Sequence, residues 1–577
     1  MARLFALIAA LAGGLLLAVV ASRPPAPLPI DAASGLFAAG RAMVDIAAIA
    51  RAPHPTGSDE DARVRAYLVG RLQALGLTVE TQAAPLSDAA RARLVRWGER
   101  PAAEARAVNV IGVLPGRDRS APAVLLMAHH DTVAGSPGAA DDSAGVAAIL
   151  ETLRALRSDP PRERDLIVLF TDAEELKSDG AAGFFRDHPL ARRIGAVINL
   201  EARGGGGRAL MFETGSGDGP MMALFARAVR RPSANSTAVL VYRLLPNITD
   251  FSIPKAAGTA GFNFAFLGRP GLYHAPQATP AAIDPGSVQH IGAQTLDLVR
   301  ALAQTPTLPP RGPDAVFCDL LGIGLIAYPA WGGWVVVAAA AGLLVFAAAR
   351  VGAAGLLTAA GTLRGAAMSL GVVLTGGGLL QLANGASGAG AGANYYDRLA
   401  AIPRLELQAL LIALAVLCLA SVGRRREARL WSGWLGIAVF VLMATIAVQA
   451  AAPAAAPVLA WPLLLGAGAA ALAARVDKAV RSAALLAALA VVGAIGVGQS
   501  LGLAHFAFLG VGQDLPGAMA VFLAPVMLIL WPLLCGTVSR RVAIGLAAAL
   551  LVAGFGLAIR VRLDPPAPTI PVYARTP

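Results

Sequence analysis

Eight apolar segments fill the C-terminal half of the chain, and they restrict its fold more than any other feature of the sequence. They lie near residues 332–349, 366–383, 405–422, 431–450, 455–474, 480–498, 516–535 and 541–559. A helix needs roughly 20 apolar residues to cross a bilayer, and each segment comes close to that length. The short run at residues 501–512 is compatible with a re-entrant piece. This half is therefore predicted to be a polytopic α-helical membrane domain, with the lipid bilayer as its partner.

Another apolar run, residues 4–21, follows Arg3 near the N-terminus. Its length fits a span, and no well-placed Ala-x-Ala site follows it, so an uncleaved anchor is favoured over a cleaved signal peptide. The total is then about nine spans. Composition agrees, because only 15% of the residues are charged and a soluble protein carries about 25%.

These segments divide the chain into five regions. We expect an N-terminal transmembrane anchor at residues 1–22, a soluble domain at 33–306, a linker at 307–330, a multi-span membrane domain at 331–560 and a tail at 561–577.

The distribution of basic residues predicts the orientation of the chain. With the N-terminus in the cytoplasm, the predicted inner loops hold Arg350, Arg364, Arg424, Arg425, Arg426, Arg429, Arg475, Lys478, Arg481, Arg540 and Arg541, whereas the outer loops hold Arg398 and Arg404 and the tail holds Arg560, Arg562 and Arg575. This bias follows the positive-inside rule and places the soluble domain outside the cytoplasm. That side is the periplasm at a bacterial inner membrane and the lumen in a eukaryote. The competing interpretation is that any chain rich in alanine and arginine drifts into such a pattern.

Several classes of function lack support. The net charge of +12 comes largely from arginines at the ends of apolar runs, not from basic clusters interleaved with aromatic residues, so no nucleic-acid partner is expected. Cys318, Cys418 and Cys535 have no paired spacing, which argues against a disulfide framework or a cysteine zinc site. No acidic or histidine pair is expected deep in the spans, so a transport role is unsupported.

The soluble domain alternates short apolar runs with amphipathic stretches. Predicted strands cover residues 108–114, 124–128, 166–171, 196–200, 209–212 and 261–266, and predicted helices cover 59–75, 143–156, 220–230 and 287–304. This alternation predicts an α/β sheet with helices on both faces. Ligands of such folds bind beyond the carboxyl ends of the strands.

Acidic and histidine residues follow successive predicted strands. They are found in His129-His130-Asp131, Asp141-Asp142, Asp172-Ala173-Glu174-Glu175, Glu201 and Tyr273-His274. A histidine that leaves a strand can bind a metal, and an aspartate two residues later can hold its other ring nitrogen. Adjacent carboxylates repel each other unless a cation lies between them. Each position alone is a weak signal, but the set predicts a metal site.

Two positions leave alternatives open. The spacing to Asp131 favours His129 over His130 as the ligand. Asp141 is favoured over Asp142 as a bridge between two cations, because Asp142 or Ser143 is a candidate N-cap of the following helix. His290 and Asp250 are interpreted as structural or orienting residues, and Arg203 is left without an assigned role.

The motifs AHHDTV (128–133), GAADDSAG (138–145), FTDAEEL (170–176), INLEARGGGG (198–207), TDF (249–251) and LYH (272–274), with HPTGS (54–58) before the first helix, carry a family resemblance. Together they resemble the dinuclear-zinc aminopeptidase family of clan MH, the leucyl aminopeptidase and glutamate carboxypeptidase type, which also includes glutaminyl cyclase. The layout is similar to that of the endoplasmic-reticulum and vacuolar membrane metallopeptidases. The resemblance covers residues 33–306 and implies a mixed-sheet zinc-peptidase domain, a phosphorylase/hydrolase-like α/β/α sandwich.

The resemblance implies two Zn²⁺ ions per domain, a peptide substrate and a role for each residue. His129 and Glu201 would bind the first zinc, Glu175 and His274 the second, and Asp141 would bridge them. Glu174 would be the general base for a water activated by both ions. One zinc, together with the Tyr273 hydroxyl, would stabilise the oxyanion, and simple packing is the alternative role for Tyr273. Asp131 would hold the His129 ring. The implied activity is that of a membrane-anchored zinc metallopeptidase of the aminopeptidase type.

The sequence departs from the family in two loops. Relatives usually continue as H-T-x-x-D after the last histidine, whereas Ala275-Pro276-Gln277-Ala278 follows His274 here, and EELKSDGA replaces the usual EELG-x-x-GS. Glutaminyl cyclase, a transferase, is an alternative within the fold. A catalytically inactive receptor or scaffold is an alternative outside enzymes, although no ligand position is lost. The sequence leaves the oligomeric state, the substrate preference and exo- versus endo-cleavage open.

Overall fold

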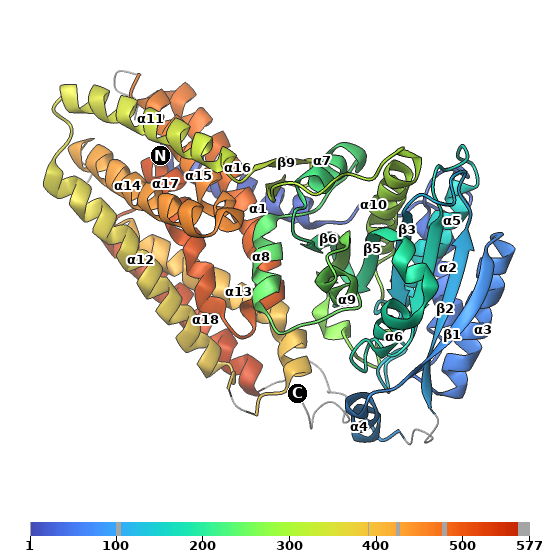
Figure 1. Cartoon of the computed structure of the whole chain (residues 1–577). Helices are drawn as coiled ribbons and strands as arrows, with labels where there is room; N and C mark the ends of the chain where they lie inside the picture. The colour runs from blue at the N-terminus through green and yellow to red at the C-terminus, as the bar shows by residue number, and fades with distance from the viewer. Residues whose placement is uncertain (1, 100–104, 391, 423–426, 476–481, 564–577) are drawn as a thin grey trace. The chain divides into compact units, whose positions relative to one another are not determined.

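The computed structural model divides the chain into two compact units, which are described separately (Figure 1). It describes all residues except 1, 100–104, 391, 423–426, 476–481 and 564–577. Among the described residues, 2–22, 328–393 and 401–563 form the helical unit, and 23–327 and 394–400 form the sheet unit. The short stretch 394–400 therefore belongs to the sheet unit although it lies far from the rest of that unit in sequence.

A seven-stranded sheet with the order β1-β2-β4-β3-β5-β7-β6 is the centre of the sheet unit. Its strands are Thr78–Pro85 (β1), Arg106–Leu114 (β2), Ala123–His129 (β3), Leu166–Thr171 (β4), Ile194–Ala202 (β5), Gly206–Thr214 (β6) and Ala260–Gly268 (β7). The central strands β4, β3, β5 and β7 are parallel, whereas β1, β2 and β6 pair antiparallel. The predicted mixed α/β sheet is confirmed, and β1 is the strand that the apolar runs did not predict.

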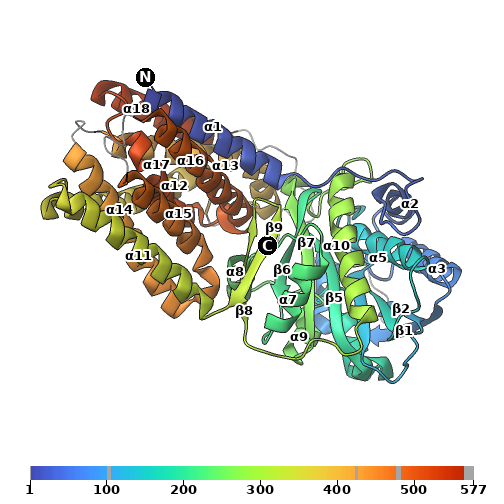
Figure 2. The same ribbon diagram turned by 90° about the horizontal axis from the view of Figure 1, so that it is seen from above.

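Helices cover both faces of this sheet, as strand–helix alternation predicts (Figure 2). They are Ala39–Ile49 (α2), Asp59–Ala74 (α3), Asp88–Arg96 (α4), Ser143–Leu156 (α5), Asp179–Asp187 (α6), Gly219–Ala228 (α7), Ser236–Leu244 (α8), Ser252–Ala256 (α9) and Pro285–Gln304 (α10). Successive residues of β3 point to opposite faces. Leu126 packs in the core that includes α5 and α10, and Leu125 packs in the core that includes Phe184 of α6.

The central strands are buried along their whole length, which explains why their sequences read as continuous apolar runs. Every residue of β3 and β4 is buried. Because these strands are parallel, their carboxyl ends meet at one edge of the sheet, and the residues that follow them are brought together there. The stretch expected as a linker, residues 307–330, contains a separate two-stranded sheet formed by Ala315–Leu320 (β8) and Gly324–Pro329 (β9).

The helical unit contains the apolar segments. Its helices are Ala2–Ser22 (α1), Gly332–Ala353 (α11), Ala359–Ala386 (α12), Tyr395–Ala420 (α13), Glu427–Ala451 (α14), Pro457–Ala473 (α15), Ala483–Ala507 (α16), Leu523–Leu534 (α17) and Arg540–Leu563 (α18), with the first turn of α13 in the sheet unit. Among the described residues, eight stretches are long and apolar enough to cross a membrane. The remaining apolar helix is α15, which has 17 residues.

Helix α1 packs closely against α16 within the helical unit. A Cβ added at Gly14 would lie 2.6 Å from Cγ1 of Val497, and one added at Gly493 would lie 2.8 Å from Cβ of Ala10. Small residues allow two apolar helices to approach in this way. The first apolar run is thus an integral helix of this unit.

Two expectations about the membrane half were wrong. Residues 501–507 continue α16, and a π-helix follows at Phe508–Gly512, so this run is no re-entrant piece. An ionisable pair also lies within the spans, because Nδ1 of His505 is 2.6 Å from Oε1 of Glu406. The sequence placed Glu406 at the edge of a span that was expected to begin at residue 405, but α13 begins earlier, at Tyr395. Ionisable groups in such helices are tolerated when they pair with one another.

Candidate metal centre

The five predicted ligands form two clusters at the carboxyl edge of the sheet. Nε2 of His129 lies 3.2 Å from Oδ1 of Asp141 and 3.8 Å from Oε2 of Glu201. Nε2 of His274 lies 3.1 Å from Oδ2 of Asp141 and 2.9 Å from Oε1 of Glu175. Asp141 therefore takes part in both clusters, one carboxylate oxygen in each. In each cluster the possible ligand atoms all lie within 4.8 Å of one another, and all five residues are buried.

The electrostatics of these clusters favour a bound cation. Burial raises the pKa of Glu201 well above its usual value. Burial alone would lower the pKa of His129, but hydrogen bonds to Asp131 and Asp141 outweigh it and raise that pKa. The buried Oε1 of Glu175 lies 2.9 Å from Nε2 of His274, so a carboxylate and an imidazole nitrogen that could both bind a metal face each other. Three buried carboxylates, together with two imidazole nitrogens and no thiolate, form a donor set that suits Zn²⁺.

The loop that carries Asp141 is fixed by the start of α5. The peptide bond between Asp141 and Asp142 is cis. Oδ1 of Asp142 accepts a hydrogen bond from the backbone N–H of Gly145 at 3.0 Å, so Asp142 is the N-cap of α5. A side chain at Gly145 would collide with this cap, because its Cβ would lie 2.4 Å from Oδ1 of Asp142. The two adjacent aspartates thus have different tasks.

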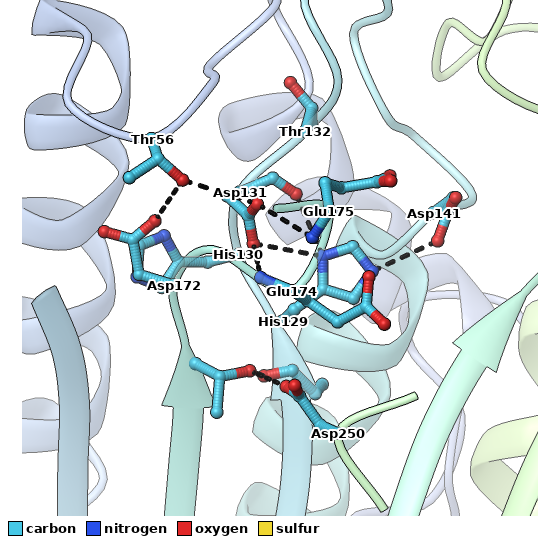
Figure 3. A network of polar contacts seen from close by, with 12 residues as sticks. Thr56, His129, His130, Asp131, Thr132, Asp141, Asp172, Glu174, Glu175 and Asp250 are labelled. Carbon is cyan, nitrogen blue, oxygen red and sulfur yellow. Dashed lines mark hydrogen bonds and ion pairs between the residues drawn. The ribbon is translucent and has the colours of Figure 1, made fainter. Parts of the chain in front are cut away.

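Asp131 organises the site differently from the sequence prediction (Figure 3). Nδ1 of His129 donates to the backbone carbonyl of Asp131 at 2.9 Å, while the Asp131 carboxylate is 3.5 Å away. That carboxylate instead accepts from the backbone N–H groups of Glu174, at 3.1 Å, and Glu175, at 3.3 Å. Ala173 has φ +62°, in the left-handed region, so the turn before these glutamates needs external support. Asp131 therefore holds the turn and, through its carbonyl, the His129 tautomer.

His130 belongs to a separate cluster with Asp61 and Asp172. Its Nδ1 lies 3.1 Å from Oδ1 of Asp61, and Asp172 accepts a hydrogen bond from the hydroxyl of Thr56 at 2.8 Å. Arg65 forms an ion pair with Asp61 and lies 3.8 Å from Asp172. The cationic side chain of Arg65 balances the carboxylates of this cluster. We therefore interpret the cluster as structural support for the neighbouring candidate metal centre. Asp61 and Thr56 were not predicted as site residues, although Thr56 lies in the HPTGS segment.

Glu174, which the sequence predicts as the general base, lies in the turn that Asp131 holds. It lies beside His129 and is partly accessible to solvent (Figure 3). Burial, and next the charge of Glu201, raise the pKa of Glu174 well above its usual value. Asp250, which accepts a hydrogen bond from the hydroxyl of Thr171, is buried more deeply, and burial raises its pKa to about 6. Its orienting or structural role stays a prediction.

The sequence matches known proteins over the part that forms this site. Residues 109–299 match peptidase family M28. The chain is 37% identical to endoplasmic reticulum metallopeptidase 1 of Mus musculus over 229 residues, which are 38% of this chain and 26% of that protein. It is 30% identical to the vacuolar membrane protease of Candida dubliniensis over 283 residues, 48% of this chain and 30% of that protein. The chain thus covers under a third of the length of these relatives.

Solved structures also match part of the chain. The aminopeptidase from Aneurinibacillus sp. strain AM-1 matches 49% of this chain and 98% of its own, with a TM-score of 0.38 and 16% identity. The glutaminyl cyclase of Bacteroides thetaiotaomicron matches 46% of this chain and 98% of its own, with a TM-score of 0.36 and 19% identity.

Three tyrosines lie near the candidate ligand His274 and its neighbours, and two of them lie outside the residues that match M28. The ring of Tyr273, inside the match, stacks on that of His274, with centroids 3.7 Å apart. Nδ1 of His274 lies 3.1 Å from the hydroxyl of Tyr396, and Arg203 donates to the hydroxyl of Tyr395 at 2.5 Å. The tyrosines at 395 and 396 lie in the stretch 394–400 of the sheet unit and were not among the predicted site residues. The oxyanion role of Tyr273 stays a prediction.

Proposed function

We propose that this protein is a membrane-anchored, zinc-dependent metallopeptidase that hydrolyses peptide bonds. The observation that carries the proposal is the pair of histidine–carboxylate clusters that share Asp141. The M28 match and the metallopeptidase relatives support the same reaction class. The proposal concerns the sheet unit, because the match lies within it.

Two zinc ions are proposed, one for each cluster. His129 and Glu201 would hold the first ion, Glu175 and His274 the second, and Asp141 would contact both. When bound, the ions would polarise the scissile carbonyl and lower the pKa of water toward 7. The Asp131 carbonyl fixes the proton of His129 on Nδ1, which leaves Nε2 free as a ligand atom.

Glu174 is proposed as the general base. Its raised pKa is suited to accepting a proton from the attacking water and returning it to the leaving amine. The hydrogen bond from its own backbone N–H to Asp131 holds the residue in place while its carboxylate faces the clusters. Tyr273, whose ring is fixed by stacking on His274, is proposed to donate a hydrogen bond from its hydroxyl to the developing oxyanion.

Cleavage from a free N-terminus is proposed as the mode of action, on the resemblance to the aminopeptidase family. A protonated substrate amine would be attracted to the acidic groups that surround the site. Acetylation of the substrate amine removes that charge. An aminopeptidase therefore loses activity on the acetylated peptide, whereas an endopeptidase retains it.

The catalytic unit is proposed to face the extracytoplasmic side, with the N-terminus in the cytoplasm. The bias of the loop arginines supports this orientation. Arg424, Arg425, Arg426, Lys478, Arg481 and Arg575 of that argument lie outside the described residues. The close packing of α1 on α16 supports an uncleaved anchor. Extracytoplasmic here means the periplasm in a bacterium and the lumen in a eukaryote.

The test uses the full-length protein in detergent, with zinc content and hydrolysis of aminoacyl amides measured together. The wild type is expected to retain two zinc ions. Glu174→Gln is expected to keep the metal and to lose turnover by a factor on the order of 10²–10⁴, the usual contribution of a general base. Glu163→Gln is the matched control, because Glu163 pairs with Arg117 far from the clusters in a partly exposed position.

Three outcomes would contradict the proposal. A wild-type protein without zinc and without turnover removes its basis. A zinc-loaded protein that releases no amino acid but converts N-terminal glutamine to pyroglutamate is a cyclase. A zinc-loaded protein inactive on both kinds of substrate is a receptor or scaffold.

A further inference from the structure

The stretch 394–400 belongs to the sheet unit although it forms the start of α13, a candidate membrane span that follows α12 in the sequence. Asn394 caps the first turn of α13, because its Oδ1 accepts from the backbone N–H groups of Tyr396, at 2.9 Å, and Asp397, at 3.2 Å. The Tyr396 ring packs against the apolar cluster that contains Val133 and Ala173. Both the backbone and the ring of Tyr396 are therefore held in place.

The hydroxyl of Tyr396 contacts a proposed zinc ligand on the side away from the cluster. Its Oη lies 3.1 Å from Nδ1 of His274. Nε2 of the same ring faces Asp141 and Glu175. A neutral histidine that offers Nε2 to a metal carries its proton on Nδ1, so this nitrogen donates to the Tyr396 oxygen.

His274 needs such a partner. Its backbone φ is +54°, in the left-handed region that non-glycine residues seldom adopt. The four residues that follow it, Ala275 to Ala278, include no carboxylate that could hold Nδ1. Stacking on Tyr273 fixes the plane of the imidazole, with an angle of 23° between the rings. Stacking alone leaves the ring free to turn within that plane, and the hydrogen bond from Nδ1 to Tyr396 restricts this rotation from the side opposite the contacts of Nε2 with Asp141 and Glu175.

The neighbouring tyrosine has a different contact and provides an internal comparison. The hydroxyl of Tyr395 accepts from Nη2 of Arg203 at 2.5 Å, and the guanidinium lies 5.8 Å from the Tyr395 ring centroid. Arg203 follows Glu201 by two residues but is not one of the clustered ligands. Loss of the Tyr395 hydroxyl therefore perturbs the same stretch without touching His274.

We propose that Tyr396 is a positioning residue that holds His274 for the second zinc ion, so that the start of α13 completes the metal centre. This inference rests on the proposed zinc-peptidase function. A partner that orients a metal-binding histidine typically contributes 10–100-fold to metal affinity or activity. The effect should appear at one of the two ions, because the His129 cluster has its own support from Asp131.

The experiment compares Tyr396→Phe with Tyr395→Phe in the full-length protein. Zinc affinity is measured by competition with a chromophoric chelator, and the absorption spectrum of the cobalt-substituted protein reports the geometry of the site. Tyr396→Phe is expected to weaken one of the two ions by about 10–100-fold and to change the cobalt spectrum. The affinity for the other ion, at the His129 cluster, and the thermal unfolding of the metal-free protein should stay as in the wild type, and Tyr395→Phe should retain both affinities.

The inference is wrong if Tyr396→Phe binds both ions with wild-type affinity, or if Tyr395→Phe loses the same ion to the same extent. Should Tyr396→Phe unfold more easily without metal, Tyr396→Met, which keeps an adaptable apolar side chain against the cluster, is measured in its place with the same expectation. Failure of the wild type to bind zinc would overturn the proposed function. Failure confined to Tyr396 would overturn only this inference.

Discussion

Replacement of His290 should remove a specific part of the acid sensitivity of the sheet unit. His290 lies in α10, is 1% exposed, and uses both ring nitrogens. Nδ1 accepts from the backbone N–H of Ala209, and Nε2 donates to the carbonyl of Arg231, each at 3.0 Å. Burial, and next the charge of Arg208, lower its pKa to about 3. A proton on Nδ1 would destroy the acceptor that Ala209 requires.

The sign and size of the effect follow from linkage. The unfolded chain protonates His290 near pH 6.5, whereas the folded chain keeps it neutral down to about pH 3. The stabilisation by neutral His290 is complete above pH 6.5 and decreases by about 1.4 kcal/mol for each unit below it. At pH 5.5 the loss is about 1.4 kcal/mol, which is tenfold in the unfolding equilibrium.

The variant His290→Asn can still accept from Ala209 but does not titrate. Any stability that the substitution itself removes is the same at pH 8.0 and pH 5.5. The ratio of the variant's exchange rate to that of the wild type therefore reports only the titration of His290. Hydrogen exchange of the β3 amides measures global opening of the sheet unit. The exchange rate of the variant relative to the wild type should fall about tenfold from pH 8.0 to pH 5.5. An unchanged ratio, within about twofold, would refute the reasoning, since His290 would then titrate alike in both states.

The other predictions concern the loop of Asp141 and the metal itself. Asp142→Ala removes the N-cap of α5 and should lower the free energy of unfolding by about 1 kcal/mol, measured by thermal unfolding. Asp142→Asn keeps an acceptor for Gly145 and should lose clearly less stability. Equal losses of stability in the two variants would contradict the role of Asp142 as a cap. Removal of zinc by a chelator should lower the unfolding temperature of the sheet unit, because the carboxylates of the two clusters then lie together without a cation, and added zinc should restore it. An unfolding temperature that does not change when the chelator is added would contradict a stabilising role of bound zinc.

The sequence predicts those parts of the fold whose residues are buried on both sides. Strands β3 and β4 are continuous apolar runs because helices cover both of their faces. Strand β1 was missed, since its residues, TVETQAAP, are mostly exposed at an edge and show no apolar alternation. The span in α13 was predicted to begin further along the chain, because the first turns of this helix carry Asp397, Arg398 and Arg404 before the apolar run begins.

The site was predicted where each residue lies near the end of a predicted strand, and it was missed where a contact joins residues far apart in the sequence. The five proposed ligands were found together because each follows a predicted strand, and parallel strands end at one edge. The backbone role of Asp131 and the support of His130 by Asp61 need side-chain positions that a sequence pattern does not contain. Tyr396 is 122 residues from His274 and lies beyond two candidate spans, so no spacing rule connects them.

The position of residues 394–400 has a consequence for biosynthesis. A ribosome makes residues 23–327 first, then α11 and α12, and only afterwards the stretch that carries Tyr396. If Tyr396 positions His274 and the sheet unit crosses the membrane, both as proposed, the catalytic unit is completed only after α11 and α12 have been synthesised. We expect the nascent peptidase to stay poorly active until that moment, which would protect the secretion machinery and other emerging chains from cleavage. Nascent chains stalled before and after residue 400, then released and assayed for zinc retention, would test this order of events.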